Sequence, residues 1–288
     1  MAAELLKLEE TYRGESAALN ALRLAMDWTH HQTNPWAKTT HQEAVNRLRE
    51  HYLTHSELDN VMSGLSFHFD LKDSIDFLDL VEKASPHSQV RASALLYQMI
   101  FLAKRVDTRN AYEQRNWKVL GLENRSLEDQ LAYRQLVDGF KEMDPEKVRN
   151  QIVEIGNRLK SEFGKSKRQG FVSTIQSFNL RRHQPDDMEE FGALADRILF
   201  RVSRLQPGEI VEDFEGEGIN GKKFRLQDFR GKVVMLMFSA NWCGLCKAIY
   251  PENRELVIAY KDRPFQMISV RADQKAERRQ SIRATSIG

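Results

Sequence analysis

The chain has 288 residues, 41% of them hydrophobic and 29% charged, a length that suits two domains of ordinary size or one large one. Its 43 Lys and Arg residues nearly balance its 41 Asp and Glu residues, and a net charge of +2 gives no electrostatic reason to expect nucleic-acid binding. Contents of 15 Gly, 7 Pro and 2 Cys exclude a collagen-like chain, a disulfide-rich scaffold and wholesale disorder.

Up to about residue 205, the spacing of apolar residues predicts helices and no convincing strand. The strongest pattern, over 86–106, has two apolar stripes, so this helix is expected to be sandwiched between neighbouring helices. The best-bounded helix is 145–163, which follows Asp144 as N-cap, begins with Pro145 and ends before Gly164. The other stretches expected to be helical are 3–27, 38–53, 71–84 and 186–205.

After Pro207-Gly208 the pattern changes to that of strands. Asn220-Gly221 favours a type I′ turn, which predicts a β-hairpin around it. The apolar run Val233–Phe238 predicts a strand covered on both faces, and Phe265–Val270 predicts a second strand. A helix between them, running to about residue 260, would complete a right-handed βαβ unit with parallel strands.

The two cysteines, Cys243 and Cys246, form a C-x-x-C motif directly after the first of these strands. A structural zinc site commonly needs four N or S ligands, but the chain has no second C-x-x-C, and its nearest histidine in sequence is His183. His51 and His55 are one helical turn apart without a third ligand, so no metal site is expected. The motif is therefore either a redox pair or a chance spacing of two cysteines that are buried as small hydrophobic residues.

The position of the pair favours redox chemistry. Cys243 is expected at a helix N-terminus, where unpaired N–H groups and the helix dipole favour the thiolate. Trp242 would shield it on one side, and Cys246 would lie one turn later and deeper. The Cys243 thiolate could then attack a partner disulfide, and Cys246 could resolve the mixed disulfide.

The segment from Gly231-Lys232-Val233-Val234 through Ala240–Cys246, with Pro251 five residues later, resembles the thioredoxin fold. It is similar to thiol-disulfide oxidoreductases of the TlpA and ResA type within the AhpC/TSA redoxin group, and the hairpin with Asp213-Phe214 is typical of that subgroup. A helical region followed by such a module resembles planctomycete-type redoxin proteins. The resemblance covers about residues 207–271.

The expected fold class is therefore α plus α/β. An all-helical bundle or array over 1–205 would precede a partial thioredoxin-like (redoxin) domain over 206–288, made of a β-hairpin and a βαβ unit. The resemblance implies a thiol-disulfide oxidoreductase with Cys243 as nucleophile and Cys246 as resolving cysteine. It also implies a protein disulfide or dithiol substrate, an upstream thiol reductant, and no cofactor beyond the cysteine pair.

Supporting roles are implied for four further residues. Trp242 matches the residue that packs beside the site, and Pro251 matches the proline that kinks the active-site helix. Gly244 and Leu245 form the dipeptide between the cysteines, which helps to set the reduction potential. Leu245 departs from the usual Pro, and Met237 stands where thioredoxin places a buried acid.

A third departure concerns the family's cis-proline loop and final antiparallel strands. The residues after Asp273 could begin the next helix, but no later proline is placed to serve as the cis-proline. We therefore expect a truncated, frame-shifted or degenerate module that is a poor reductase and prone to aggregate through an uncovered sheet edge.

Two other functions stay open. A peroxiredoxin-type peroxidase needs a Thr three residues before its reactive Cys, where this chain has Ala240. Alternatively, the helical region would be a protein-binding scaffold and the redox module vestigial. The resemblance implies an extracytoplasmic bacterial location, but the first residues lack the features of a signal peptide, and no apolar run approaches the roughly 18 residues of a membrane span.

Overall fold

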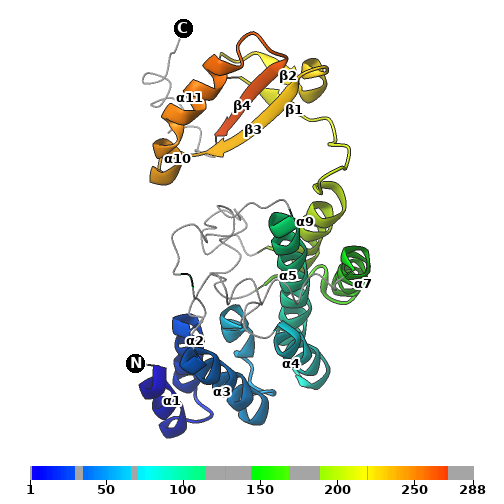
Figure 1. The fold of residues 1–288 in the computed structure, drawn as a ribbon. Helices are drawn as coiled ribbons and strands as arrows, with labels where there is room; N and C mark the ends of the chain where they lie inside the picture. The colour runs from blue at the N-terminus through cyan, green and yellow to red at the C-terminus, as the bar shows by residue number, and fades with distance from the viewer. Residues whose placement is uncertain are drawn as a thin grey trace. The chain divides into compact units, whose positions relative to one another are not determined.

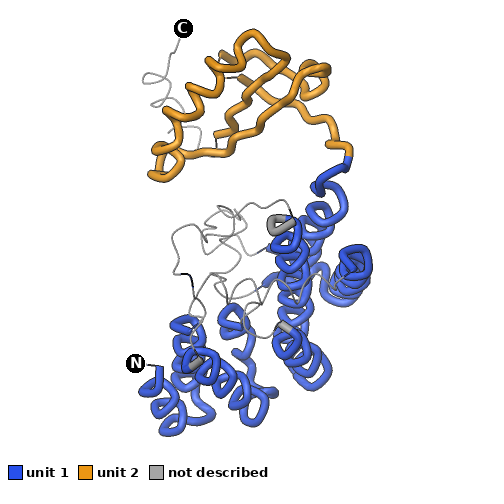
Figure 2. Tube along the Cα trace, viewed as in Figure 1, with its two compact units in different colours: residues 1–209 blue, residues 210–288 orange. Residues whose placement is uncertain are grey.

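The computed structural model describes residues 2–29, 35–65, 71–113, 127, 144–168, 189–218 and 220–271. The chain divides into two compact units, residues 1–209 and 210–288 (Figure 2). Helices make up the first unit, and a hairpin and a βαβ arrangement make up the second (Figure 1), so the predicted α plus α/β fold class is confirmed. None of the described helices is both long and apolar enough to cross a bilayer.

In the first unit, one long helix forms the centre of the hydrophobic core. This helix, α5, packs against α4, α7, α9 and the 3-10 helix η1. Its buried side chains, which include Leu95, Tyr97 and Phe101, project over a wide arc, which confirms that it is sandwiched between neighbours. The elements of this unit are α1 (Ala2–Thr11), α2 (Ser16–Thr29), α3 (Pro35–His51), η1 (Leu58–Gly64), α4 (Leu71–Ala84), α5 (Ser88–Glu113), α7 (Pro145–Phe163) and α9 (Phe191–Arg204).

The stretch 3–27, which was expected to be helical, consists of two helices, α1 and α2, with a turn between them. The chain turns between α1 and α2, and Gly14 adopts a left-handed conformation there with φ of +90°. Only glycine adopts this conformation at no steric cost. The turn allows α1 and α2 to pack against each other.

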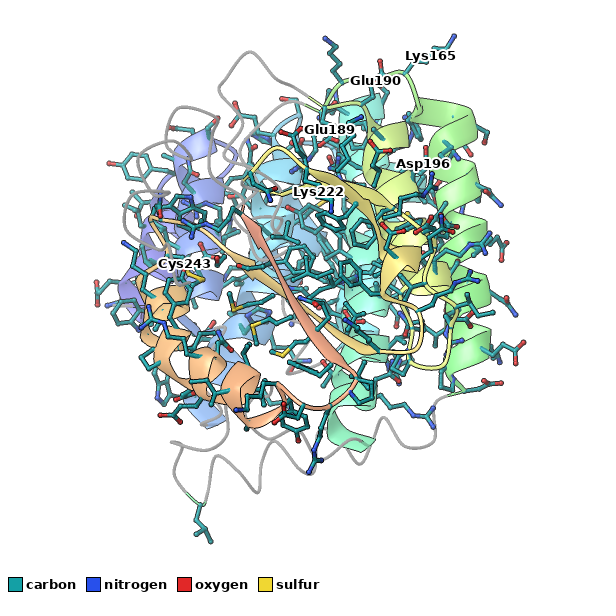
Figure 3. All side chains as sticks on the ribbon, turned by 90° about the horizontal axis from the view of Figure 1, so that it is seen from above. Lys165, Glu189, Glu190, Asp196, Lys222 and Cys243 are labelled. Atoms are coloured by element: carbon teal, nitrogen blue, oxygen red, sulfur yellow. A yellow bond between two sulfur atoms is a disulfide. The ribbon has the colours of Figure 1, made fainter. Side chains whose placement is uncertain are left out.

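Helix α7 begins as its sequence predicts, and its end meets the start of α9. The Asp144 carboxylate accepts hydrogen bonds from the backbone N–H groups of Glu146 and Lys147, at 2.9 and 3.4 Å. Past the helix, Gly192 N donates to Gly164 O at 3.0 Å. Figure 3 labels Lys165, which follows α7, and Glu189 and Glu190, which precede α9. Helix α9 corresponds to the predicted helix 186–205. Residues 169–188, which include the start of that predicted helix, lie outside the described residues.

The second unit begins with the predicted hairpin, in which β1 (Glu215–Glu217) pairs antiparallel with β2 (Lys223–Arg225), followed by the 3-10 helix η2 (Leu226–Phe229). The predicted type I′ turn is wrong. Gly221 N donates to Gly218 O at 2.9 Å, and Gly221 follows that turn with φ of +77°. This is the longer hairpin loop with a glycine bulge, for which Asn-Gly is equally suitable.

A parallel pair of strands, β3 (Val233–Ser239) and β4 (Phe265–Arg271), forms the rest of the unit with α10 (Gly244–Ala248) and α11 (Tyr250–Ala259). The two helices lie on one face of the strands (Figure 1). The prediction that β3 is covered on both faces is wrong for the described residues, because Val233 and Phe238 are 68% and 64% exposed. Within the described part of this unit, the buried residues are Ser239 and Ala240.

Candidate active site

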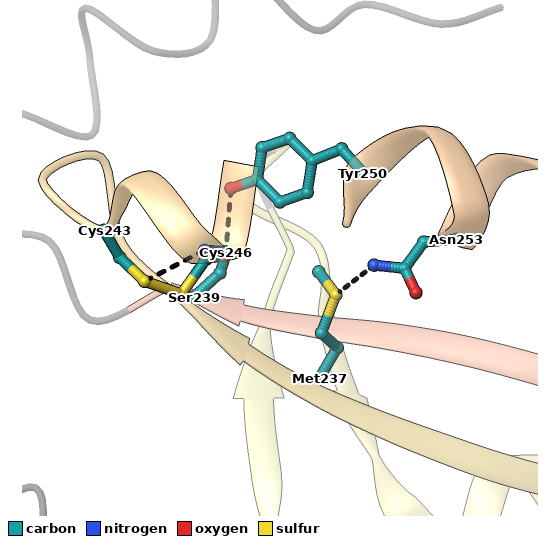
Figure 4. Close-up of a disulfide and its surroundings, with 6 residues drawn as sticks. All are labelled: Met237, Ser239, Cys243, Cys246, Tyr250 and Asn253. Atoms are coloured by element: carbon teal, nitrogen blue, oxygen red, sulfur yellow. Dashed lines mark hydrogen bonds between the residues drawn. A yellow bond between two sulfur atoms is a disulfide. The ribbon is translucent and has the colours of Figure 1, made fainter. Parts of the chain in front are cut away.

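Cys243 and Cys246 lie at the carboxyl end of β3, where α10 begins (Figure 4). They are joined by a disulfide, with their Cα atoms 5.3 Å apart. Cys243 is the N-cap of α10, and its Sγ accepts a hydrogen bond from the backbone N–H of Cys246 at 3.1 Å. A side-chain acceptor at the N-cap and a donor three residues later form the usual arrangement at a helix start.

The backbone between β3 and α10 is a tight turn. Cys243 N donates to Ala240 O at 3.1 Å, which closes a four-residue turn at the buried end of the strand. Lys247 N then donates to Cys243 O at 3.2 Å, which starts the helix. The nucleophile predicted from the sequence is therefore held by backbone hydrogen bonds on both sides.

The active-site helix breaks after one turn. Ile249 separates α10 from α11, and Pro251 lies in the first turn of α11. Proline has no N–H and is therefore tolerated only near a helix start, which accounts for the end of α10 and the start of α11 at this point. Gly244, the first residue of α10, has open space around its Cα.

The two side chains that flank the disulfide are largely exposed. Trp242 is 75% exposed and Leu245 is 85% exposed, although both are large apolar residues. The cysteines themselves are partly buried. The two exposed apolar side chains therefore flank the partly buried cysteines on the surface of this unit.

Polar side chains of α11 contact β3 next to the disulfide (Figure 4). Asn253 Nδ2 donates to the sulfur of Met237 at 2.7 Å, and the Tyr250 hydroxyl donates to Ser239 Oγ at 3.3 Å. The sequence analysis missed Tyr250, although the predicted helix to about residue 260 would have placed it on the same side as Cys246, four residues later.

The sequence analysis also missed a contact between the ends of the two strands. Arg271, the last residue of β4, donates from its guanidinium to the side-chain oxygen of Asn241. The parallel register places Arg271 opposite Ser239, two residues before Asn241. Placing the two predicted strands side by side and parallel would have brought Asn241 and Arg271 together, because parallel strands place their carboxyl ends at one edge of a sheet.

The hairpin before the site is organised by one carboxylate. Asp213 Oδ1 accepts from the backbone N–H of Gln227 at 2.9 Å, and its Oδ2 accepts from Arg225 Nε at 2.7 Å. The hydrogen bond from Gln227, with that from Arg225, lowers the pKa of Asp213 below its usual value. Asp213 therefore stays ionised and joins the chain before β1 to the chain after β2.

Residues 207–288 match the AhpC/TSA family. The thiol-disulfide oxidoreductase ResA of Bacillus thuringiensis (strain Al Hakam) is 34% identical over 83 residues, which are 29% of this chain and 45% of ResA. ResA of Oceanobacillus iheyensis is 33% identical over 82 residues, 27% of this chain and 40% of that protein. The thioredoxin-like protein YneN of Bacillus subtilis is 37% identical over 59 residues, 20% of this chain and 35% of YneN.

The chain thus spans less than half the length of these curated relatives. No solved structure gives a significant match. The matched segment contains both cysteines, so the part of the chain that carries the C-x-x-C motif is similar to the AhpC/TSA family and to ResA. Among the described residues of the whole chain, no three His, Cys, Asp or Glu side chains are grouped as metal ligands.

Proposed function

We propose that this chain is a thiol-disulfide oxidoreductase that exchanges protein disulfides through Cys243 and Cys246. The observation that carries the proposal is the Cys243–Cys246 disulfide at the junction of β3 and α10. It lies inside the segment that matches the AhpC/TSA family and is similar to ResA. The spacing of the two cysteines allows one dithiol to take up and release two electrons.

In the reducing direction, the Cys243 thiolate attacks one sulfur of a substrate disulfide. A new S–S bond forms to Cys243, the substrate S–S bond breaks, and the first substrate sulfur leaves as a thiolate that takes up a proton. Cys246 then loses its proton and attacks the Cys243 sulfur. This step releases the second substrate thiol and restores the Cys243–Cys246 disulfide, so two electrons pass from the protein to the substrate.

The local geometry supports Cys243 as the attacking residue. The Cys246 N–H that points at the Cys243 sulfur would stabilise a negative charge on that sulfur, which favours the thiolate. The exposed Trp242 and Leu245 leave an approach open beside it. Cys246 follows one turn later in α10 and reaches the same sulfur, as their disulfide requires.

The reaction requires a second partner. Each turnover in the reducing direction leaves the pair oxidised, so an upstream thiol reductant must return two electrons before the next one. No further cofactor is needed for this exchange, because both electrons reside on the two sulfur atoms.

A redox titration of the full chain in glutathione buffers tests the proposal. Alkylation of free thiols followed by intact-mass measurement should show one two-electron transition in which Cys243 and Cys246 change together. The Cys246→Ser variant, with Cys243 reduced, should form a stable mixed disulfide with insulin, whose disulfides serve as the substrate. The Cys243→Ser variant should not. Two thiols that titrate independently, or that pair only between chains, would contradict the proposal.

Hydrogen peroxide distinguishes the peroxidase alternative. If peroxide alone oxidises Cys243 faster than a protein disulfide does, then the chain is a peroxidase and the exchange reaction is secondary. We expect the reverse, because Ala240 supplies no hydroxyl three residues before Cys243.

A further inference from the structure

The contact between Arg271 and Asn241 connects the end of β4 to the segment that carries Cys243. Arg271 donates from Nη2 to Asn241 Oδ1, across 30 residues of sequence. Both side chains are partly buried. A guanidinium loses fewer alternative conformations than a lysine when it forms a hydrogen bond, so this contact holds its partner at a defined place.

Asn241 is the second residue of the turn that delivers the nucleophile. Ala240 O and Cys243 N close this turn at 3.1 Å, and Ala240 is only 2% exposed. The first residue of the turn is therefore anchored by burial and the fourth by its hydrogen bond. The Asn241 side chain, fixed by Arg271, is a third anchor for the same short segment.

Arg271 is also the one charged residue in the sequences of β3 and β4. An arginine guanidinium carries a positive charge. The Cα atoms of Asn241 and Cys243 are two residues apart, which is at most about 7.6 Å. The other charged side chains of the neighbouring described elements are Lys247 on α10 and Glu252, Arg254 and Glu255 on α11, all exposed to solvent, which screens their effect.

We propose that Arg271 is a positioning residue for the exchange reaction: through Asn241 it fixes the turn before Cys243, and it keeps a positive charge on the turn that carries this cysteine. This inference rests on the proposed role of Cys243 as the nucleophile. Arg271 acts through Asn241 and does not itself touch the substrate.

The test measures the thiolate of Cys243 directly. In a Cys246→Ser background Cys243 is the only thiol of the chain, and the pH dependence of its alkylation by iodoacetamide reports its ionisation. Arg271→Gln should move the midpoint of that profile to higher pH and slow alkylation at neutral pH about threefold. Asn241→Ala should move it in the same direction although the charge is kept, and Arg271→Lys should give a smaller shift.

Combining Arg271→Gln with Asn241→Ala identifies the route of the effect. If Arg271 acts through Asn241, the double variant should be scarcely slower than Arg271→Gln alone. Arg263→Gln is the matched control, since Arg263 lies over the Tyr260 ring before the opposite end of β4. It removes the same charge and should leave the profile unchanged.

Unchanged profiles in Arg271→Gln and Asn241→Ala would overturn the proposal, as would fully additive effects of the two substitutions. Circular dichroism separates these results from unfolding. If a variant loses its strand signal, the pH profile of alkylation in Arg271→Lys is used instead to decide whether the proposal holds. Alkylation needs no protein substrate. A chain that fails to reduce insulin therefore still gives this profile, so the proposed function and this inference can fail separately.

Discussion

Glu9 of α1 and Arg47 of α3 form an ion pair of 2.8 Å in which the carboxylate is completely buried. The Tyr52 hydroxyl donates to the same carboxylate at 2.9 Å, and Arg13 Nε donates at 3.0 Å. Burial alone would raise the pKa of Glu9, but the hydrogen bonds from Arg13, Arg47 and Tyr52 outweigh it and hold the pKa below its usual value. This cluster attaches the first helix to the rest of the unit.

Glu9→Gln is therefore expected to destabilise the helical unit. The amide keeps the shape of the side chain but leaves Arg47 without its buried counter-charge, a change that costs about 2–4 kcal/mol. Urea unfolding followed by circular dichroism measures the loss. Glu4→Gln is the control, because the Glu4–Lys7 pair is exposed and its removal should have almost no effect. Equal midpoints for the two variants would refute the role given to Glu9.

A buried histidine predicts that the helical unit loses stability in mild acid. His41 is 5% exposed, and its Nδ1 lies 3.4 Å from Thr29 Oγ1. Burial lowers the pKa of His41 from 6.5 to about 4. The neutral form is thus favoured in the folded state, so its contribution is complete above pH 6.5 and is lost as the pH falls towards 4.

The loss should reach roughly 3 kcal/mol across that range. His41→Gln, which cannot titrate, should flatten this part of the curve of unfolding free energy against pH. His51→Gln is the control, because the His51 side chain is 31% exposed. A curve that keeps its full slope in His41→Gln would show that other groups cause the acid sensitivity.

The junction of α7 and α9 predicts an unusual effect of a glycine substitution. Alanine in place of glycine ordinarily stabilises a helix interior by up to about 1 kcal/mol. At Gly192, however, a Cβ would lie 2.9 Å from the backbone oxygen of Gly164, which cannot rotate away. Gly192→Ala should therefore lower the unfolding free energy, by about 1–3 kcal/mol. The exposed neighbour Ala193 gives the control, Ala193→Gln, for which we expect little change in the same urea titration.

Leu245→Pro should make the cysteine pair more reducing, given the proposed function. Leu245 is the second residue of α10, where proline removes no intrahelical hydrogen bond. Proline restricts the open dithiol more than the closed ring, so closure loses less entropy and the potential should fall by roughly 10–20 mV. Glutathione titration beside Leu245→Ala measures it. A potential that stays constant or rises in Leu245→Pro alone would contradict this argument.

What the sequence could predict depended on how far apart the interacting residues lie. Asp144 caps α7 through bonds to the next few residues, so its role could be read locally. The helical pattern over 3–27 did not reveal the turn at Gly14, because the local sequence is compatible with a helix or a turn. Asn220-Gly221 led to the wrong turn type, because this pair suits both a short and a bulged hairpin loop. The choice between them depends on packing between distant segments.

The polar contacts of the cores and of the candidate site were beyond local reasoning. Arg47 reaches Glu9 across 38 residues, and Arg271 reaches Asn241 across 30. Neither contact can be predicted from a sequence motif. The cysteines could be found because their spacing and the preceding apolar strand lie within one short stretch of sequence, whereas Arg271, which we propose positions them, comes from another strand.

If Arg271 positions Cys243 as proposed, the one-to-one register of β3 and β4 makes the chemistry of the cysteines depend on how the strands align. Ser239 is paired with Arg271 in that register. A shift of one residue would turn every side chain of β4 to the other face of the sheet and carry the guanidinium away from Asn241. A substitution far down either strand, chosen only to loosen pairing, would therefore change the reactivity of Cys243 without touching it. The pH dependence of Cys243 alkylation would therefore report on the alignment of β3 and β4.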